Sequence, residues 1–179
     1  MKRSTLKRMI LAALFLAIGY VLPFLTGGIK EIGNMLAPMH LPVLLCGIVC
    51  GWKYGLVVGA VMPVTRSLMF GMPRLYPNAV AMAFELATYG LIVGILYDQR
   101  QRQSLPRLYV SLVSAMLAGR LVWGAVEALL LGVFGSGFTL SMFVAGAFLN
   151  SLPGILLQLV LIPALTLALQ RARLLPLQE

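Results

Sequence analysis

Apolar residues fill six long runs of this chain, and short segments rich in charged or turn-forming residues separate them. A helix of about 20 apolar residues crosses the roughly 30 Å hydrocarbon core of a bilayer, and a partly buried helix can be shorter. The pattern therefore predicts about six transmembrane helices, over residues 9–25, 40–51, 54–70, 78–97, 108–134 and 140–169. The second and third runs are short, whereas the last is long enough to tilt or to start as a loop.

The composition agrees with a chain that is surrounded by lipid. Hydrophobic residues make up 60% of the 179 residues and charged residues only 11%, whereas about a quarter of a soluble domain is charged. So few polar side chains cannot cover a water-exposed surface. We therefore expect a single transmembrane domain over residues 1–179, of the all-α polytopic class.

The positions of the basic residues indicate how the helices are oriented. With the N-terminus inside, ten Lys and Arg residues fall in cytoplasmic segments, two (Lys30 and Arg74) in outer segments, and two (Arg66 and Arg120) within spans. Cytoplasmic segments of membrane proteins carry such an excess. We expect an even number of spans and two cytoplasmic termini. The net charge of +9 reflects this topology rather than nucleic-acid binding, because the basic residues form no single stripe.

Motifs for catalysis and for metal binding are absent from the sequence. It contains no G-x-x-x-x-G-K-[ST], H-E-x-x-H, C-x-x-C or G-x-S-x-G. Cys46 and Cys50 lie in an apolar run, where free cysteines behave as small hydrophobic residues. We therefore expect no hydrolytic site, no metal site and no cofactor, and an intramembrane enzyme stays open although no catalytic cluster indicates one.

Glycines recur every four residues at Gly47, Gly51, Gly55 and Gly59. Small residues at this spacing allow helices to approach closely. Because Gly51 and Gly55 are expected to flank the turn between the second and third spans, the run is not expected to form one interface.

Four charged residues fall inside the predicted spans: Arg66, Glu85, Arg120 and Glu127. Charged side chains within a membrane are costly and usually functional. Arg120 and Glu127 share one helix face with Trp123 but are too far apart on that helix to pair directly. Each of them therefore needs a partner on another helix or a ligand. For Trp123, simple packing and stacking on a ligand are equally open.

Other polar residues lie near these charges in the predicted topology. Tyr89 shares a helix face with Glu85, and Asn150 and Gln158 add hydrogen-bonding groups on the last span. Arg74, Tyr76 and Asn78 belong to the outer loop that would cover such a pocket. The candidate substrate-binding residues are Asn34, Arg66, Arg74, Tyr76, Asn78, Glu85, Tyr89, Arg120, Trp123, Glu127 and Asn150.

Three interpretations of the intramembrane charges remain open. The two glutamates could pair with Arg66 and Arg120 as structural bridges, the four could line a pocket for a small polar molecule, or they could relay protons or ions. A basic excess in the outer half favours an anionic ligand, because arginine fits a carboxylate with two hydrogen bonds. His40, the only histidine, is interpreted as an interfacial residue at a helix start.

Three stretches of the chain resemble a known family. They are the basic start with A-L-F-L-A at 13–17, the stretch M-H-L-P-V-L-L-C-G-I-V-C-G-W-K-Y-G-L-V-V-G at 39–59, and R-S-L-M-F-G-M-P with A-M-A-F-E-L-A-T-Y-G at 66–73 and 81–90. Together with its size and six spans, the chain resembles the substrate-binding S components of energy-coupling factor (ECF) vitamin transporters of prokaryotes.

The resemblance implies a membrane subunit that binds a small water-soluble vitamin in an outward-facing pocket and catalyses no reaction. Its partners would be an ECF module of one membrane scaffold protein and two ATPases, in the prokaryotic inner membrane. Ala13 and Ala17 would form the small-residue face that docks on the scaffold. The resemblance is greatest to members assigned to pantothenate, with pyridoxine and other B vitamins as rivals.

Two other classes of function remain to be tested against this one. An intramembrane enzyme acting on lipid or isoprenoid would use Glu85 or Glu127 as acid or base, and an assembly subunit would bind no small molecule. In the vitamin-binding interpretation, the outer loops over 27–35 and 71–77 would act as gates.

Overall fold

The computed structural model of the chain describes residues 3–26, 38–97, 104–133, 139–146 and 151–172. These residues are almost entirely helical, and no strand occurs among them. The elements in chain order are α1 (Arg3–Val21), η1 (Leu22–Thr26), α3 (His40–Cys50), α4 (Trp52–Phe70), η2 (Leu75–Ala79), α5 (Val80–Leu96), α6 (Leu105–Val133), α7 (Leu140–Val144) and α8 (Leu152–Arg171).

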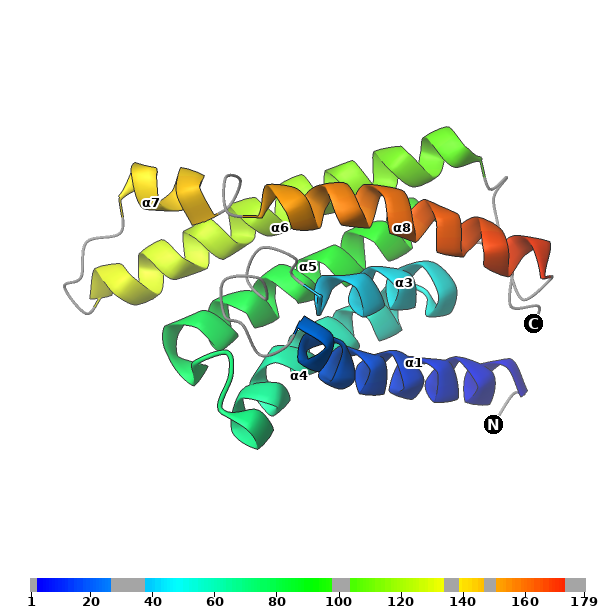
Figure 1. Cartoon of the computed structure of the whole chain (residues 1–179), viewed down its shortest axis with the longest axis horizontal. Helices are drawn as coiled ribbons and strands as arrows, with labels where there is room; N and C mark the ends of the chain where they lie inside the picture. The colour runs from blue at the N-terminus through cyan, green and yellow to red at the C-terminus, as the bar shows by residue number, and fades with distance from the viewer. Residues whose placement is uncertain (1–2, 27–37, 98–103, 134–138, 147–150, 173–179) are drawn as a thin grey trace.

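The helices confirm the predicted all-α polytopic class. Four segments are long and apolar enough to cross a membrane, over Thr5–Phe24, Leu75–Leu96, Leu105–Gly132 and Leu152–Arg171. The predicted second and third spans correspond to the short α3 and to α4. Figure 1 shows that α1 begins and α8 ends at the same end of the bundle, as an even number of spans requires.

The last predicted span, over 140–169, is divided in the structure, in line with its being long enough to start as a loop. The structure has the five-residue α7 and then a separate helix, α8, that begins at Leu152. Pro153 lies in the first turn of α8, where a proline is tolerated because the first N–H groups of a helix have no partner within it. The Ser151 hydroxyl donates a 2.9 Å hydrogen bond to the carbonyl of Gly146, which joins the two sides of the break.

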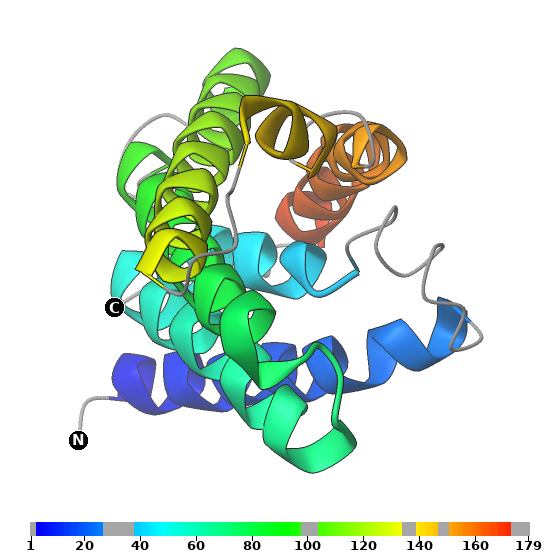
Figure 2. The same cartoon turned by 90° about the vertical axis from the view of Figure 1, so that its left-hand side faces the viewer.

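Helix α3 forms the centre of the bundle, and each of its residues is buried. It packs against α1, α4, α5 and α8, and Figure 2 shows it between α1 and α8. A helix that is apolar all round is expected to be buried on every side. Its 11 residues span roughly 16 Å at about 1.5 Å per residue, so α3 reaches only about halfway across a bilayer core.

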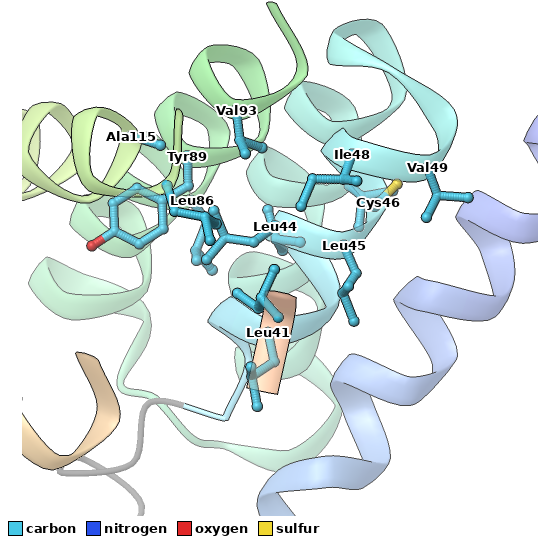
Figure 3. Close-up of a cluster of buried hydrophobic side chains, with 14 of the residues drawn as sticks. Leu41, Leu44, Leu45, Cys46, Ile48, Val49, Leu86, Tyr89, Val93 and Ala115 are labelled. Carbon is cyan, nitrogen blue, oxygen red and sulfur yellow. The ribbon is translucent and has the colours of Figure 1, made fainter. Parts of the chain in front are cut away.

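The apolar core includes side chains that pack between α3 and α5. Figure 3 shows Leu44 and Ile48 of α3 against Leu86 and Val93 of α5, with Ala115 of α6 beyond them. The Tyr89 ring belongs to the same cluster, and its hydroxyl points away from the aliphatic side chains. Tyr89 therefore connects the apolar core to polar residues on its far side.

The glycine run on α3 and α4 forms one interface with α5, contrary to the sequence-based expectation. A Cβ atom at Gly47 would lie 2.7 Å from the carbonyl oxygen of Gly90, and a Cβ atom at Gly55 would lie at the same distance from that oxygen. A Cβ atom at Gly59 would meet the backbone of Leu86. Gly51 forms the turn with φ 94°, which brings its two neighbours onto the same surface of α5.

Candidate functional site

A buried ion pair joins α5 and α6 near the middle of the bundle. The Nη1 atom of Arg120 lies 3.1 Å from Oε1 of Glu85, and both side chains are almost completely buried. Two intramembrane charges thus partner each other, as the cost of an isolated charge in lipid requires. This contact supports the structural-bridge interpretation for one of the two glutamates.

Two further side chains reach the same oxygen of Glu85. The Tyr89 hydroxyl donates to Oε1 over 3.2 Å from one turn along α5. The Nε2 atom of His40 lies 3.5 Å from Oε1, and the His40 ring meets the Tyr89 ring edge-on with centroids 5.2 Å apart. Residues from α3, α5 and α6 therefore converge on one carboxylate.

His40 is a site residue that the sequence interpretation missed. It does begin a helix, α3, but it is only 3% exposed, so it is not an interfacial residue. Because α3 is so short, its first residue lies at the depth of Glu85 rather than at the bundle end. A lone histidine at the start of a wholly apolar helix was the only signal in the sequence.

Gly119 allows Tyr89 and Arg120 to take these positions. A Cβ atom at Gly119 would coincide with the Tyr89 ring, at its Cδ1 and Cε1 atoms, and would lie 3.2 Å from the carbonyl oxygen of Glu85. The absence of a side chain therefore lets α6 approach α5 just before Arg120 and fixes how far its guanidinium reaches.

Glu127 lies two turns beyond Arg120 on α6 and is buried without a cationic partner in the described part of the chain. It is 7% exposed, and its Oε2 atom has no hydrogen-bond partner. The carboxylate of Glu85 is close enough to act on it electrostatically. The sequence-based pairing of both glutamates with arginines is therefore not found for Glu127.

Other buried polar atoms near these helices also lack hydrogen bonds within the described residues. They are Nδ1 of His40, Nε of Arg120 and Nε2 of Gln158 on α8. Helix α8 packs against both α3 and α6, the helices that carry the first two of these residues. Buried polar groups are nearly always satisfied, so this set calls for a partner that the described residues do not supply.

Trp123 lies between Arg120 and Glu127 along α6 and packs against α7. Its ring stacks on that of Phe143, with centroids 6.4 Å apart and planes at 22°. A Cβ atom at Gly146 would lie 2.8 Å from the Trp123 ring. The packing interpretation of Trp123 is thus supported, and α7 lies over the helix face that carries Arg120 and Glu127.

Arg66 belongs to a different cluster from the one around Glu85. Its Nη1 atom donates a 2.6 Å hydrogen bond to the carbonyl oxygen of Tyr20. The guanidinium lies 5.0 Å from the centroid of Phe24 and 5.3 Å from that of Phe70. The structure therefore assigns Arg66 to the junction of α1, η1 and α4 rather than to an ion pair with either glutamate.

The candidate residues of the outer segment lie at the surface. Arg74, Tyr76 and Asn78 on or beside η2 are exposed. The Tyr76 hydroxyl donates a 2.6 Å hydrogen bond to the carbonyl of Leu130, which connects this segment to the far part of α6. Asn34, Asn150 and the predicted gate over 27–35 lie outside the described residues.

The small-residue face of α1 is also at the surface. Ala13 and Ala17 are both exposed, whereas Ala12 and Gly19 are buried. The buried side of α1 packs against α3 and α4. The opposite side carries the two exposed alanines.

These features describe a class of protein: a polytopic helical membrane protein with a partly unsatisfied polar cluster between its central helices. Comparison of the sequence with models of known families identifies the family. The sequence model of the family "ECF transporter, substrate-specific component" matches residues 7–166, and the chain belongs to this family. No curated protein and no solved structure matches the chain.

Membership confirms the resemblance found in the sequence. The family consists of substrate-specific subunits of transporters rather than of enzymes. It places the chain in a membrane and implies a small-molecule substrate and a partnership with an ECF module. The family match does not specify which molecule is carried.

Proposed function

We propose that this chain is the high-affinity binding subunit of an ECF importer that takes up a small water-soluble vitamin across a prokaryotic inner membrane. The observation that carries the proposal is the set of buried polar atoms without partners, on α3, α6 and α8, in a chain of this family. In a vitamin-bound complex, the hydroxyl, amide and charged groups of the ligand would satisfy them.

The binding site in this proposal lies around the outer parts of α5, α6 and α8. Glu85, Tyr89 and Arg120 form its floor, Trp123 and Glu127 its side, and His40 joins them from α3. Arg74, Tyr76, Asn78, Asn34 and Asn150 would contact the ligand or close over it, and the segments 27–35 and 71–77 would act as gates. Arg66 keeps a supporting role at the end of α1.

Pantothenate is the vitamin that sequence likeness favours, and pyridoxine is its main rival. The argument for an anionic ligand such as pantothenate requires arginines in the outer half that are free to bind it. Arg120 is engaged by Glu85 and Arg66 by the Tyr20 carbonyl, which leaves the exposed Arg74 as the remaining candidate for a carboxylate. The geometry therefore supports the vitamin class more strongly than it supports pantothenate.

The chain would work with an ECF module of one membrane scaffold protein and two ATPases. The exposed pair Ala13 and Ala17 would dock on the scaffold, because small residues four apart permit close helix contact. Energy would come from the ATPases, in agreement with the missing phosphate-binding loop of this chain.

Titration of the purified chain in lipid nanodiscs with a panel of B vitamins tests the proposal. We expect one vitamin to bind stoichiometrically and to raise the melting temperature, since a ligand that binds only the folded state stabilises it. Turnover of an isoprenoid or lipid by the isolated chain would instead support an intramembrane enzyme. Binding of no small molecule would support an assembly subunit.

A further inference from the structure

The charges around Glu85 are balanced within the chain. Arg120 contacts the Glu85 carboxylate at 3.1 Å, and both His40 and Tyr89 face the same oxygen. Among the described residues, the two side chains of this cluster that can carry positive charge are therefore both directed at Glu85. They provide no counter-charge for a second carboxylate.

Glu127 is that second carboxylate. It is more than nine-tenths buried, its Oε2 atom has no partner, and no ion pair involves it in the described ranges. Burial of an unpaired carboxylate is expensive, and the nearby charge of Glu85 adds repulsion. Charged groups kept within membrane helices despite this cost usually have a function.

We infer that Glu127 recognises a protonated nitrogen of the substrate, and hence that the transported vitamin carries a positively charged group. This inference rests on the proposed function and assigns the substrate a different charge from that of pantothenate. A cationic nitrogen would supply both the missing counter-charge and a hydrogen-bond donor for Oε2. Charge-assisted hydrogen bonds of this kind are among the strongest in proteins.

Two other buried donors without hydrogen-bond partners, on α6 and α8, suit the rest of such a molecule. The free Nε2 of Gln158 and Nε of Arg120 are donors, so they would face hydroxyl or ring-nitrogen acceptors of the ligand. Trp123 lies on the same α6 face as Arg120 and Glu127 and stacks on Phe143, so aromatic rings lie on the side of α6 that carries the carboxylate, and cations are attracted to the faces of such rings. A small nitrogen heterocycle with a protonated amine meets all of these requirements.

The test compares the charge of the ligand with the charge of residue 127. Pyridoxamine and thiamine serve as cationic probes and pantothenate as the anionic probe, each titrated into wild-type protein and the Glu127→Gln variant in nanodiscs. We expect a cationic probe to bind wild type more tightly than pantothenate does. Glu127→Gln should then weaken the cationic probe by about tenfold to a hundredfold, the range for a hydrogen bond to a charged group.

The melting temperature of the ligand-free protein separates this role from a structural one. Glu127→Gln removes an unpaired buried charge, which costs stability. The melting temperature of the variant should therefore be unchanged or higher, as is common when a residue kept for binding is replaced. Glu85→Gln is the matched comparison, and it should lower the melting temperature because Arg120 loses its partner. A stable Glu127→Gln protein with weaker cation binding supports the inference.

Two outcomes would overturn it. Tight binding of pantothenate to wild type, unchanged or improved in Glu127→Gln, would sink the charge assignment and leave the vitamin-binding function standing. A Glu127→Gln protein that melts well below wild type would show that Glu127 is a structural residue. Failure of all three probes and of every other B vitamin would instead remove the proposed function, and the inference with it.

Discussion

Arg120 of α6 and Glu85 of α5 form a buried ion pair with 3.1 Å between Nη1 and Oε1. The pair determines how the other polar residues can be used. It occupies the most deeply placed arginine and orients the Glu85 carboxylate toward His40 and Tyr89. Among the described residues, Glu127 is then left without a counter-charge.

Arg120→Ala should destabilise the protein strongly, because it leaves the Glu85 carboxylate buried and unpaired. Loss of one partner of a buried pair costs about 3–5 kcal/mol. The double variant Arg120→Ala with Glu85→Gln should recover part of that loss, because it removes the orphaned charge as well. Thermal unfolding of the single and double variants in the same detergent measures the coupling. Strictly additive effects would contradict a direct interaction.

Gly119→Ala should perturb the site through Tyr89. The new methyl group would occupy the position of the Tyr89 ring, and overpacking of this kind costs about 1–3 kcal/mol. Both the melting temperature and the vitamin affinity should fall. Gly132→Ala on the same helix is the matched control, because nothing lies within 4 Å of a Cβ atom there. An equal response of the two variants would argue against close packing at Gly119.

Ala13→Trp combined with Ala17→Trp should abolish ATP-driven uptake by the full ECF complex while vitamin binding by the isolated chain persists. Both alanines are exposed, so the added bulk can be accommodated within the chain but would block a docking helix. Val160→Trp on α8, at a side chain that is 71% exposed, is the control and should transport normally. Undiminished uptake by the double variant would show that this face does not dock.

Fluorescence of Trp123 should report ligand binding. The chain has two tryptophans, and Trp52 is exposed at the start of α4, so a Trp52→Phe variant leaves Trp123 as the single emitter. Trp123 shares its helix face with Arg120 and Glu127, and we expect the bound vitamin to shift or quench its emission. The same titration with an additional Phe143→Ala change tests the role of α7 stacking. Emission that stays constant on saturation would place the ligand elsewhere.

Much of the fold could be predicted from the sequence because lipid imposes simple rules. The length of apolar runs and the bias of Lys and Arg gave the helical class and the even number of spans. The same rules cannot detect a break inside an apolar run. Residues 140–169 look continuous, but α8 begins within this run at Leu152, just before Pro153, and the hydrogen bond from Ser151 to Gly146 marks the division.

The candidate site could be predicted only in part. The cost of intramembrane charge correctly singled out Glu85 and Arg120 as residues in need of partners, but periodicity within one helix cannot say which helices meet. Charge alone groups Arg66 with them, whereas in the structure its guanidinium lies against the aromatic rings of Phe24 and Phe70. The sequence does not place His40 in this site, because the depth of His40 depends on how short α3 is.

The most direct test of the central claim is mass spectrometry of small molecules that co-purify with the protein from its native membrane. The account predicts one vitamin in a stoichiometric amount, released on denaturation and absent from preparations of a Glu85→Gln variant. It further predicts that this vitamin carries a protonated nitrogen. Protein that is fully folded yet binds no vitamin, whether co-purified or added, would contradict the assignment as a vitamin-binding subunit.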